Sequence, residues 1–320
     1  MSEDRPALRL GTRRSPLALA QARLARAALQ ASDPTLSVEL VEMTSDGDVD
    51  MRDLRVIGER GIFAHTLERA LLDGTIDAAV HSSKDLALED TPGLVLAAWL
   101  EREDPRDALV GADADLLELP QGVHLATGSA RRSASIRTLR ADLTTSPIRG
   151  NVQTRIATAR ERGDAGCVLA MAGLNRLGIT DGAECSVRPI PVTQLVPEAG
   201  QGAVVIQARE HVCARTGFAY AAIDHVATRR SVQLERALAR HLGGGCERPV
   251  GVHVELDALR VHAFFAPSPD DAGTRIEHDV MGLELGTLMS VSAGADVDDA
   301  ADWTATRLAP DLANQLGVPG

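Results

Sequence analysis

The sequence contains a single lysine, Lys84, and this lysine stands directly before a carboxylate, Asp85. Of the 33 basic side chains, all the others are arginines. Arginine is a flat, permanently charged fork, whereas lysine is a compact charge whose pKa moves readily on burial. A carboxylate beside it in a cleft can stabilise a developing cation or accept its proton. The alternative for Lys84 is that the lysine has been retained by chance. The alternative for Asp85 is that it forms a simple ion pair with Lys84.

Cys246 is the second residue whose setting suggests chemistry. It follows three glycines, 243–245, which predict an exposed loop. A thiol in such a place can act as a nucleophile or as a covalent anchor, and a free thiol without a role is the alternative. Cys185 and Cys213 lack this setting and are interpreted as structural. The four cysteines include no Cys-x-x-Cys pair, which indicates free thiols in a reducing cytoplasm.

Arginines also gather where predicted strands turn into predicted helices. The carboxyl ends of parallel strands and the helix N-termini that follow them line the ligand crevice of an open sheet. Arginine binds carboxylate or phosphate there in a bidentate manner. We therefore predict a cleft for a small molecule with several anionic groups; surface arginines on solvated helices are the alternative. The residues are Arg13 and Arg14, Arg131 and Arg132, and Arg149 and Arg155, with the hydroxyls of Ser15, Thr127 and Ser129.

Strands and helices are predicted to alternate through the first two thirds of the chain, which is typical of α/β units with largely parallel sheets. Ser15 is the predicted N-cap of the first helix, with Pro16 at its first position. The predicted strands are 8–11, 36–43, 76–82, 123–126, 146–148 and 167–171. The predicted helices cover 16–30, 63–72, a segment ending near 139, and 154–162.

The region after about residue 225 has a different pattern. A helix is predicted over 231–242, followed by strands over 250–256 and 259–265. A final helix is predicted to begin with Asp298 as its N-cap and to run to about 316. This order indicates a smaller α+β domain. Segments 101–105 and 196–202 are the predicted linkers.

Composition excludes several classes of protein. A length of 320 residues suits two or three domains. The net charge of −12 and 2% aromatic content argue against a nucleic-acid binder. We find no signal peptide, no apolar run long enough to span a membrane, no metal-ligand spacing and no glycine-rich nucleotide loop.

These residues lie within motifs that resemble the porphobilinogen deaminase (hydroxymethylbilane synthase) family. The resemblance covers nearly all of residues 8–266, and eight motifs occur in the expected order. They are LRLGTRRSPLALAQ (8–21), GIFAHTLERALLDGTIDAAVHSSKDL (61–86), EREDPRDALV (101–110), ATGSARR (126–132), IRGNVQTRI (148–156), AGLNRLGI (172–179), PEAGQGAV (197–204) and GGGCERPVG (243–251).

The resemblance implies a three-domain α/β protein. Two lobes like those of type II periplasmic binding proteins would comprise residues 1–100 plus 202–222 and residues 106–196, and a smaller α+β domain would comprise 227–320. It further implies a cytoplasmic, monomeric transferase with a dipyrromethane cofactor linked to Cys246. Four porphobilinogen molecules would be joined head to tail, with loss of ammonia, into hydroxymethylbilane. Neither nucleic acid, membrane nor metal would be a partner.

The resemblance also implies roles for individual residues. Asp85 would be catalytic and would face the pyrrole N–H groups, while a cation forms as ammonia leaves. Segment 45–62 would be a lid, with Phe63 over the cleft. The cofactor's carboxylates would be held by Ser82, Lys84, Thr127, Ser129, Arg131, Arg132, Arg149 and Gly150. The substrate would contact Arg13, Ser15, Phe63, Arg149, Arg155, Arg176 and Gln201.

Three positions depart from the family's usual residues. Arg60 replaces a lysine, Gly128 replaces a serine and so removes one cofactor hydroxyl, and Gly243 replaces a glutamate in the cysteine loop. Two other functions remain open at this point. A noncatalytic two-lobed anion-binding protein would share the arginines but would not need Cys246 or the Lys84–Asp85 pair. A cysteine hydrolase would need a histidine base, and the sequence nominates none.

Overall fold

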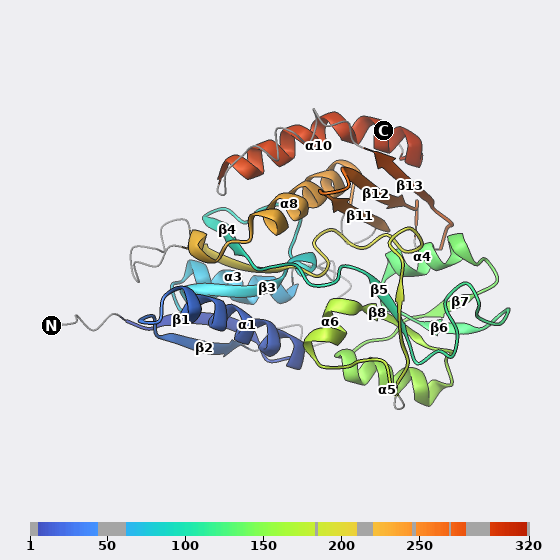
Figure 1. The fold of residues 1–320 in the computed structure, drawn as a ribbon, viewed down its shortest axis with the longest axis horizontal. Helices are drawn as coiled ribbons and strands as arrows, with labels where there is room; N and C mark the ends of the chain where they lie inside the picture. The colour runs from blue at the N-terminus through green and yellow to red at the C-terminus, as the bar shows by residue number, and fades with distance from the viewer. Residues whose placement is uncertain are drawn as a thin grey trace.

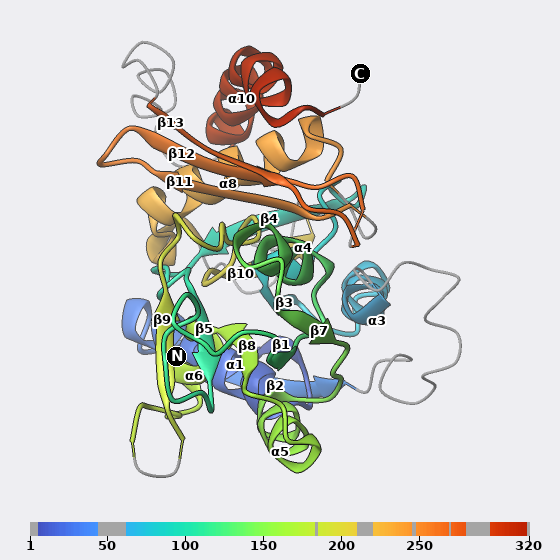
Figure 2. The ribbon, with the colours of Figure 1, turned by 90° about the vertical axis from the view of Figure 1, so that its right-hand side faces the viewer.

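The computed structural model describes residues 6–43, 62–182, 185–209, 220–244, 248–268, 270–279 and 295–318. Within these residues the strands form two five-stranded sheets and one three-stranded sheet. Figures 1 and 2 show two α/β lobes beside each other, with the three-stranded unit lying above both. Two lobes and a smaller α+β unit confirm the predicted fold class.

The first lobe is built on a sheet with the strand order β2-β1-β3-β10-β4. The strand β1 is parallel to both β2 and β3, whereas β10 is antiparallel to both β3 and β4. These strands are β1 (Leu8–Arg13), β2 (Val38–Met43), β3 (Ala78–Ser82), β4 (Leu94–Trp99) and β10 (Val204–Arg209).

Helices cover both faces of this sheet because its buried strands are apolar on both sides. Ala78 and Val80 of β3 pack in the cluster formed with the helix α1 (Pro16–Ser32). Ala79, between them, packs in the cluster formed with the helix α3 (Ile62–Leu72). The two helices therefore hold β3 from opposite sides, and its carboxyl end continues into the segment that contains Lys84.

The second lobe repeats the same arrangement with the strand order β7-β6-β8-β5-β9. Ala108 and Val110 pack on one face of the sheet, and Leu109 packs on the other. The strands are β5 (Asp107–Val110), β6 (His124–Ala126), β7 (Thr144–Ser146), β8 (Cys167–Ala170) and β9 (Val187–Ile190). The helices are α4 (Ala130–Leu139), α5 (Val152–Arg162) and α6 (Met171–Arg176).

The chain passes between the lobes twice, and each passage ends in the strand that opposes its neighbours. The first passage leads into β5, which is antiparallel to β8 and β9. The second leads into β10, which is antiparallel to β3 and β4. The sheets are therefore mixed, with one antiparallel strand each, rather than purely parallel.

The third unit packs the helices α8 and α10 on one face of its sheet. Leu238 and Leu312 meet Val252 in this core. Phe264 faces the other way and packs against Ala134 and Val196 of the second lobe and its linker. The elements are η3 (Tyr220–Ile223), a short 3₁₀ helix before the unit, α8 (Val226–His241), β11 (Val250–Glu255), β12 (Arg260–Phe265), β13 (Thr274–Asp279) and α10 (Ala295–Leu316).

Most predicted elements are confirmed, and the exceptions have identifiable causes. The Ser15 hydroxyl accepts from the Ala18 N–H at 3.2 Å, so it caps α1 as predicted. Asp298 is not an N-cap, because α10 already begins at Ala295. An acidic residue interacts favourably with the helix dipole at any position of the first turn, so the sequence alone does not fix which residue begins the helix. The sequence did not predict β4, β5, β9 and β10, whose partners are distant in the chain, nor β13, which pairs with its sequence neighbour β12.

A buried ion pair joins the third unit to both linkers. Arg102 Nη1 and Nη2 donate to the two carboxylate oxygens of Glu235 at 2.7 and 2.9 Å. The same carboxylate accepts from the backbone N–H groups of Gly200 at 2.8 Å and Val254 at 2.9 Å. Because Glu235 is completely buried, each of these donors compensates a charge that has no access to water.

This pair makes stability depend on pH. Burial acts to raise the pKa of Glu235, but the charge of Arg102 and the hydrogen bond from His253 outweigh it and lower the pKa to about 2. A carboxyl whose pKa is lower in the folded state contributes stability above its unfolded pKa, and the contribution is lost as pH falls towards the folded value.

We predict that Glu235→Gln lowers the free energy of unfolding by about 3 kcal/mol at pH 7, because Arg102 is left buried without its anion. Denaturant unfolding from pH 7 downwards will show this deficit shrinking between about pH 4.5 and 2. As a control, Asp302→Asn removes the exposed pair with Arg240 and costs less than about 1 kcal/mol. A deficit for Glu235→Gln that does not change with pH would contradict the assignment.

Candidate active site

The carboxyl ends of β1 and β3 place the predicted residues of the first lobe at one edge of the sheet. The two strands are parallel neighbours, so Arg13 and Ser82 end them on the same side. Ser15 follows β1 and begins α1. The Ser82 hydroxyl accepts from Gln21 Nε2 at 2.9 Å, which ties the end of β3 to α1. Gln21 was not among the predicted site residues.

Lys84 and Asp85 lie in a single 3₁₀ turn, η2 (Ser83–Asp85), directly after β3. Ser83 is buried below the turn, and Gly200 of the second linker lies against it. Gly200 has a φ of +76°, and a Cβ at this position would come within 2.3 Å of the Ser83 hydroxyl oxygen. Only glycine lets the linker approach so closely. Asp85 is exposed, and Lys84 next to it is half-buried.

The Lys84 ammonium donates to Gln201 Oε1 at 3.1 Å. Burial, together with the nearby charge of Arg132, lowers the pKa of Lys84 to about 8, although Asp85 and Asp107 act in the opposite direction. This pKa lies close to physiological pH, so the charge of Lys84 is sensitive to what lies beside it. An anionic ligand beside it would favour the charged form.

The arginines of the second lobe converge on a carboxylate that the sequence analysis did not select, Asp107. Arg131 Nη2 donates to its Oδ2 at 2.9 Å, while Arg132 Nε and Nη2 donate to its Oδ1 at 3.0 and 2.7 Å. Gln201 Nε2 donates to the same Oδ1 at 2.8 Å. We call Lys84, Asp107, Arg131, Arg132 and Gln201 the Asp107 cluster.

The Asp107 cluster carries more positive than negative charge. It contains three cationic side chains and one carboxylate, so two positive charges remain when Lys84 is protonated. Burial acts to raise the pKa of Asp107, but the charges of Arg131 and Arg132 overcome this and hold the pKa far below its usual range. The carboxylate is thus always ionised, and the surplus charge can attract anionic groups.

Two predicted hydroxyls cap the start of α4. The Ser129 hydroxyl accepts from the Arg132 N–H at 3.4 Å, and the Thr127 hydroxyl accepts from the Ser129 N–H at 3.3 Å. Between them, Gly128 lies against the loop after β7, and a Cβ there would come within 2.6 Å of the Ile148 carbonyl oxygen. Glycine at position 128, in place of the family's usual serine, therefore lets this loop approach the loop that contains Ile148 more closely.

Arg149, Gly150 and Arg155 form a separate group at the start of α5. Gly150 has a φ of +104°, a conformation that favours glycine, and its carbonyl accepts from Arg155 Nε at 2.8 Å. Arg149 is exposed on the same loop. The Asn151 side chain caps α5 by accepting from the Thr154 N–H at 2.9 Å. The loop thus presents two guanidinium groups close to a helix N-terminus.

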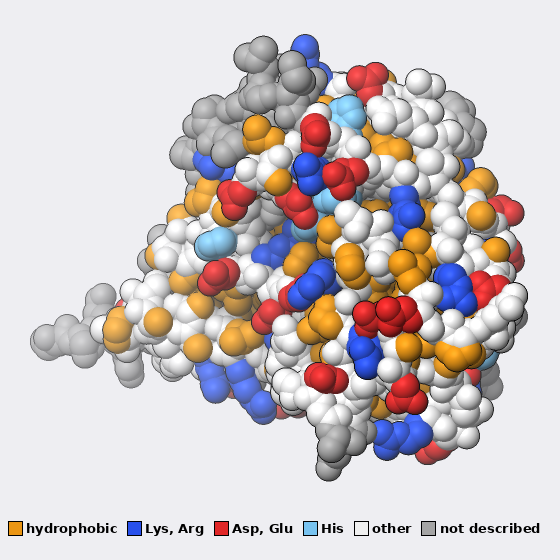
Figure 3. Space-filling model, turned by 45° about the vertical axis from the view of Figure 1, so that its right-hand side comes forward, with side chains coloured by type: hydrophobic (Ala, Val, Ile, Leu, Met, Phe, Trp, Pro, Cys, Tyr) orange, Lys and Arg blue, Asp and Glu red, His pale blue; other side chains and the backbone are white. Residues whose placement is uncertain are grey.

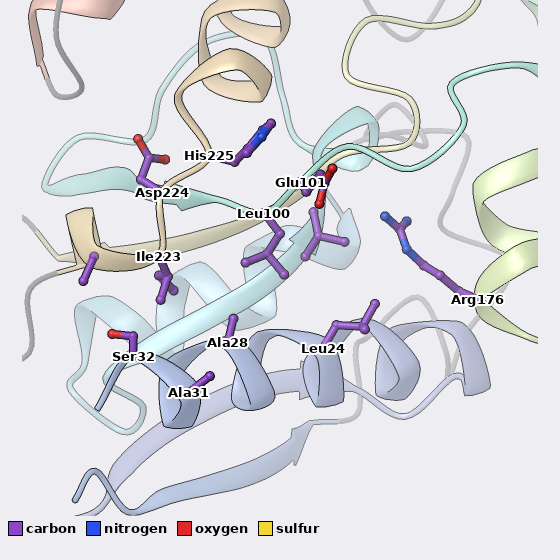
Figure 4. A pocket seen from close by; sticks show the side chains of 12 residues that line it. Leu24, Ala28, Ala31, Ser32, Leu100, Glu101, Arg176, Ile223, Asp224 and His225 are labelled. Carbon is purple, nitrogen blue, oxygen red and sulfur yellow. The ribbon is translucent and has the colours of Figure 1, made fainter. Parts of the chain in front are cut away.

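Arg176 extends from α6 towards the first lobe, where its Nη2 donates to the Gly202 carbonyl at 2.6 Å. Burial lowers the pKa of this guanidinium. Figure 4 shows it pointing into a cavity above α1, beside Glu101 and below His225. The cavity has a volume of about 630 Å³ and is lined mainly by apolar side chains of α1 and η3, together with Leu100 and Val204. The structure thus brings Arg176 to the linkers.

Several predicted residues lie outside what the structure describes. Cys246, Arg60 and segment 45–61 belong to these residues, and for Phe63 only its place in the first turn of α3 is described. Gly243 is described and adopts a φ of +70° directly after α8. The lid and the cysteine loop therefore remain predictions.

Charges of both signs alternate over the face shown in Figure 3, without a broad basic area. Among the described residues, no helix is long and apolar enough to cross a membrane, and no group of three His, Cys, Asp or Glu side chains could hold a metal ion.

The single lysine permits a direct test of the low pKa. Reductive methylation with a carbon-13 label will mark Lys84 and the α-amino group, and no other amine of the chain. The measurement uses Cys246→Ala, which lacks the thiol expected to carry the anionic cofactor. We predict that the Lys84 signal of this variant titrates near pH 8, because burial of Lys84 disfavours its charged form. NMR spectra recorded from pH 6 to 11 will check this, with Lys84→Arg identifying the signal. A midpoint near 10.5 would show that Lys84 is well solvated.

Comparison with known proteins shows which family this chain is similar to. Residues 8–214 match the family model "Porphobilinogen deaminase, dipyromethane cofactor binding domain". The porphobilinogen deaminase of Ralstonia nicotianae is 43% identical over 268 residues, which cover 82% of this chain and 78% of that protein. The enzyme of the same name from Syntrophus aciditrophicus is 41% identical, over 88% of this chain and 92% of its own.

Among solved structures, the periplasmic aliphatic sulphonate binding protein SsuA from Escherichia coli aligns with 73% of this chain and 74% of its own. Its sequence identity is 16% and the TM-score is 0.40, which is too low to bear on function. The family model and the relatives are decisive, because they cover most of the chain at about 40% identity. The chain belongs to the porphobilinogen deaminase family.

Proposed function

We propose that this protein joins four porphobilinogen molecules head to tail, releasing ammonia, on a dipyrromethane attached to Cys246. Hydrolysis of the bond to the dipyrromethane would then free hydroxymethylbilane and leave the dipyrromethane on the protein. The observation that carries this proposal is the exposed Asp85 carboxylate beside the positively charged Asp107 cluster, in a chain of this family. The reaction needs a site that gathers carboxylates and yet keeps one carboxylate available for proton chemistry.

The residues present fit the cofactor. A dipyrromethane with acetate and propionate side chains needs several cationic partners, and the Asp107 cluster has two positive charges in excess. When bound, it supplies the pyrrole carbon to which the first substrate is joined. Its carboxylates would be held by Ser82, Lys84, Thr127, Ser129, Arg131 and Arg132, with Arg149 and Gly150 at the adjoining loop. The Cys246 sulfur would form the covalent link.

The substrate would bind where the ends of β1 and α5 face each other across the lobes. Arg13 and Ser15 come from the first lobe, while Arg149 and Arg155 come from the second. Their guanidinium groups suit the two carboxylates of porphobilinogen. Phe63 would cover the ring, and Arg176 would act from the linker side.

Asp85 would serve the chemistry of each addition. Loss of ammonia from porphobilinogen leaves a cation, and a nearby carboxylate stabilises such a charge. The same carboxylate can accept the proton that the newly bonded pyrrole carbon loses after coupling. Its exposure and its position in η2 next to Lys84 support this role.

The alternative, a noncatalytic anion-binding protein, would use the same arginines. It would have no need of Asp85 or of a covalent cofactor, and the membership of the family weighs against it. We further propose a cytoplasmic monomer. Its domains would be residues 1–100 plus 202–222, 106–196 and 227–320, and the three separate sheets support this division.

The covalent cofactor gives a direct test. Intact-mass measurement of the purified protein will show the added mass of one dipyrromethane, and Cys246→Ser will show the bare chain, because the anchoring sulfur is missing. Cys185→Ser serves as the matched control and keeps the added mass. A bare-chain mass for active wild-type protein would rule out the proposed function.

We predict that Asp85→Asn keeps the added mass and the unfolding temperature, since Asp85 is exposed. Its turnover of porphobilinogen will fall by about 100-fold or more, as expected when a proton-transfer group is lost. Product formation over time is the measurement, with the exposed Asp90→Asn as the control. Turnover within about twofold of wild type would remove Asp85 from the mechanism.

A further inference from the structure

We propose that Asp107 is a positioning residue whose carboxylate holds Arg131, Arg132 and, through Gln201, Lys84 as one preformed site for the carboxylates of the cofactor. This inference rests on the proposed function, because it names the internal anion around which that site is built. Asp107 itself touches neither substrate nor cofactor in this role.

Asp107 is saturated with hydrogen bonds. Its Oδ1 accepts from Arg132 Nε, Arg132 Nη2 and Gln201 Nε2, and its Oδ2 accepts from Arg131 Nη2. These four bonds use the capacity of a carboxylate. The side chain is completely buried, so it has no surface to offer to a ligand.

The two arginines lie where positive charge is unfavourable. Arg131 and Arg132 lie in the first turn of α4, where the helix dipole disfavours positive charge. They are only 2% and 5% exposed, so water does little to solvate them. Two adjacent buried guanidinium groups would separate or turn outwards without an anion between them. Asp107 at the start of β5 supplies this anion and fixes both side chains.

Gln201 joins the two lobes through its side chain. Its Nε2 donates to the Pro105 carbonyl and to Asp107, both at 2.8 Å. Its Oε1 accepts from Lys84 Nζ at 3.1 Å and from Arg132 Nη2 at 3.5 Å. An amide has two donors and two acceptor positions, and all four are in use. Gln201 therefore transmits the position of Asp107 to Lys84 and has no capacity left for the substrate.

The experiment compares cofactor loading with stability. Asp107→Asn keeps the shape of the side chain but removes the charge that orients the arginines. After incubation with porphobilinogen, intact-mass measurement is expected to show a loaded fraction below about a tenth of the wild-type fraction. The loaded molecules will keep the wild-type KM for porphobilinogen, because Asp107 does not contact the substrate arginines.

Asp77→Asn is the matched control. Asp77 is also completely buried and is paired with an arginine, accepting from Arg9 Nε at 3.1 Å and Nη2 at 2.9 Å, but it lies just before β3, at the end opposite Lys84. We expect it to lower the thermal unfolding midpoint and to leave loading unchanged. Equal loss of loading in both variants at equal loss of stability would overturn the proposal, because the effect would then be structural.

Normal loading of folded Asp107→Asn would overturn it as well. If Asp107→Asn does not fold, Gln201→Met decides, since it breaks the link between Asp107 and Lys84 without unpairing a buried charge. We expect reduced loading for this variant too, and full loading would count against the proposal. A wild-type protein without added mass would instead refute the proposed function, so the two failures are distinguishable.

Discussion

The two linkers between the lobes are held in place by buried carboxylates, each of which is paired with arginines. Glu235 holds Arg102 at the start of the first linker, and the Arg102 Nε also donates to the Gln201 backbone carbonyl at 2.9 Å. The Gln201 side chain then reaches Asp107. A continuous polar network thus runs from the third unit to the second lobe. A shift of either linker would leave a buried charge without its partner, which costs several kcal/mol.

This network explains why the candidate site lies where it does. The second linker packs against η2, and Gly200 allows its close approach to Ser83. Lys84 is therefore connected to the arginines of the other lobe through a single amide, Gln201. Asp85, one residue further, remains exposed. The half-buried Lys84 therefore contributes positive charge, whereas the exposed Asp85 next to it can exchange a proton.

The two lobes share one strand order although their sequences show no repeat. In each, the strand that enters after a linker runs against its neighbours, β10 in the first lobe and β5 in the second. Each linker thus returns the chain to the middle of a sheet, where it pairs on both sides. This exchange of strands puts Asp107, at the start of β5, beside both the linkers and the arginines of α4.

The sequence by itself determined the elements that depend on local signals and the residues with distinctive chemistry. Ser15 and Pro16 predicted the start of α1, the apolar run before His81 predicted β3, and the motifs around Lys84, Asp85 and the paired arginines predicted the family. The short strands β4, β5, β9 and β10 were missed, because their stability comes from partners far away in the chain. Only the tertiary structure revealed Asp107 as the common partner of Arg131 and Arg132, and Gln201 as a linker residue with all its hydrogen bonds used. The physical reason is that Asp107 has no local sequence signal to distinguish it from an exposed aspartate. Its burial and its arginine partners arise only when distant segments come together in the fold.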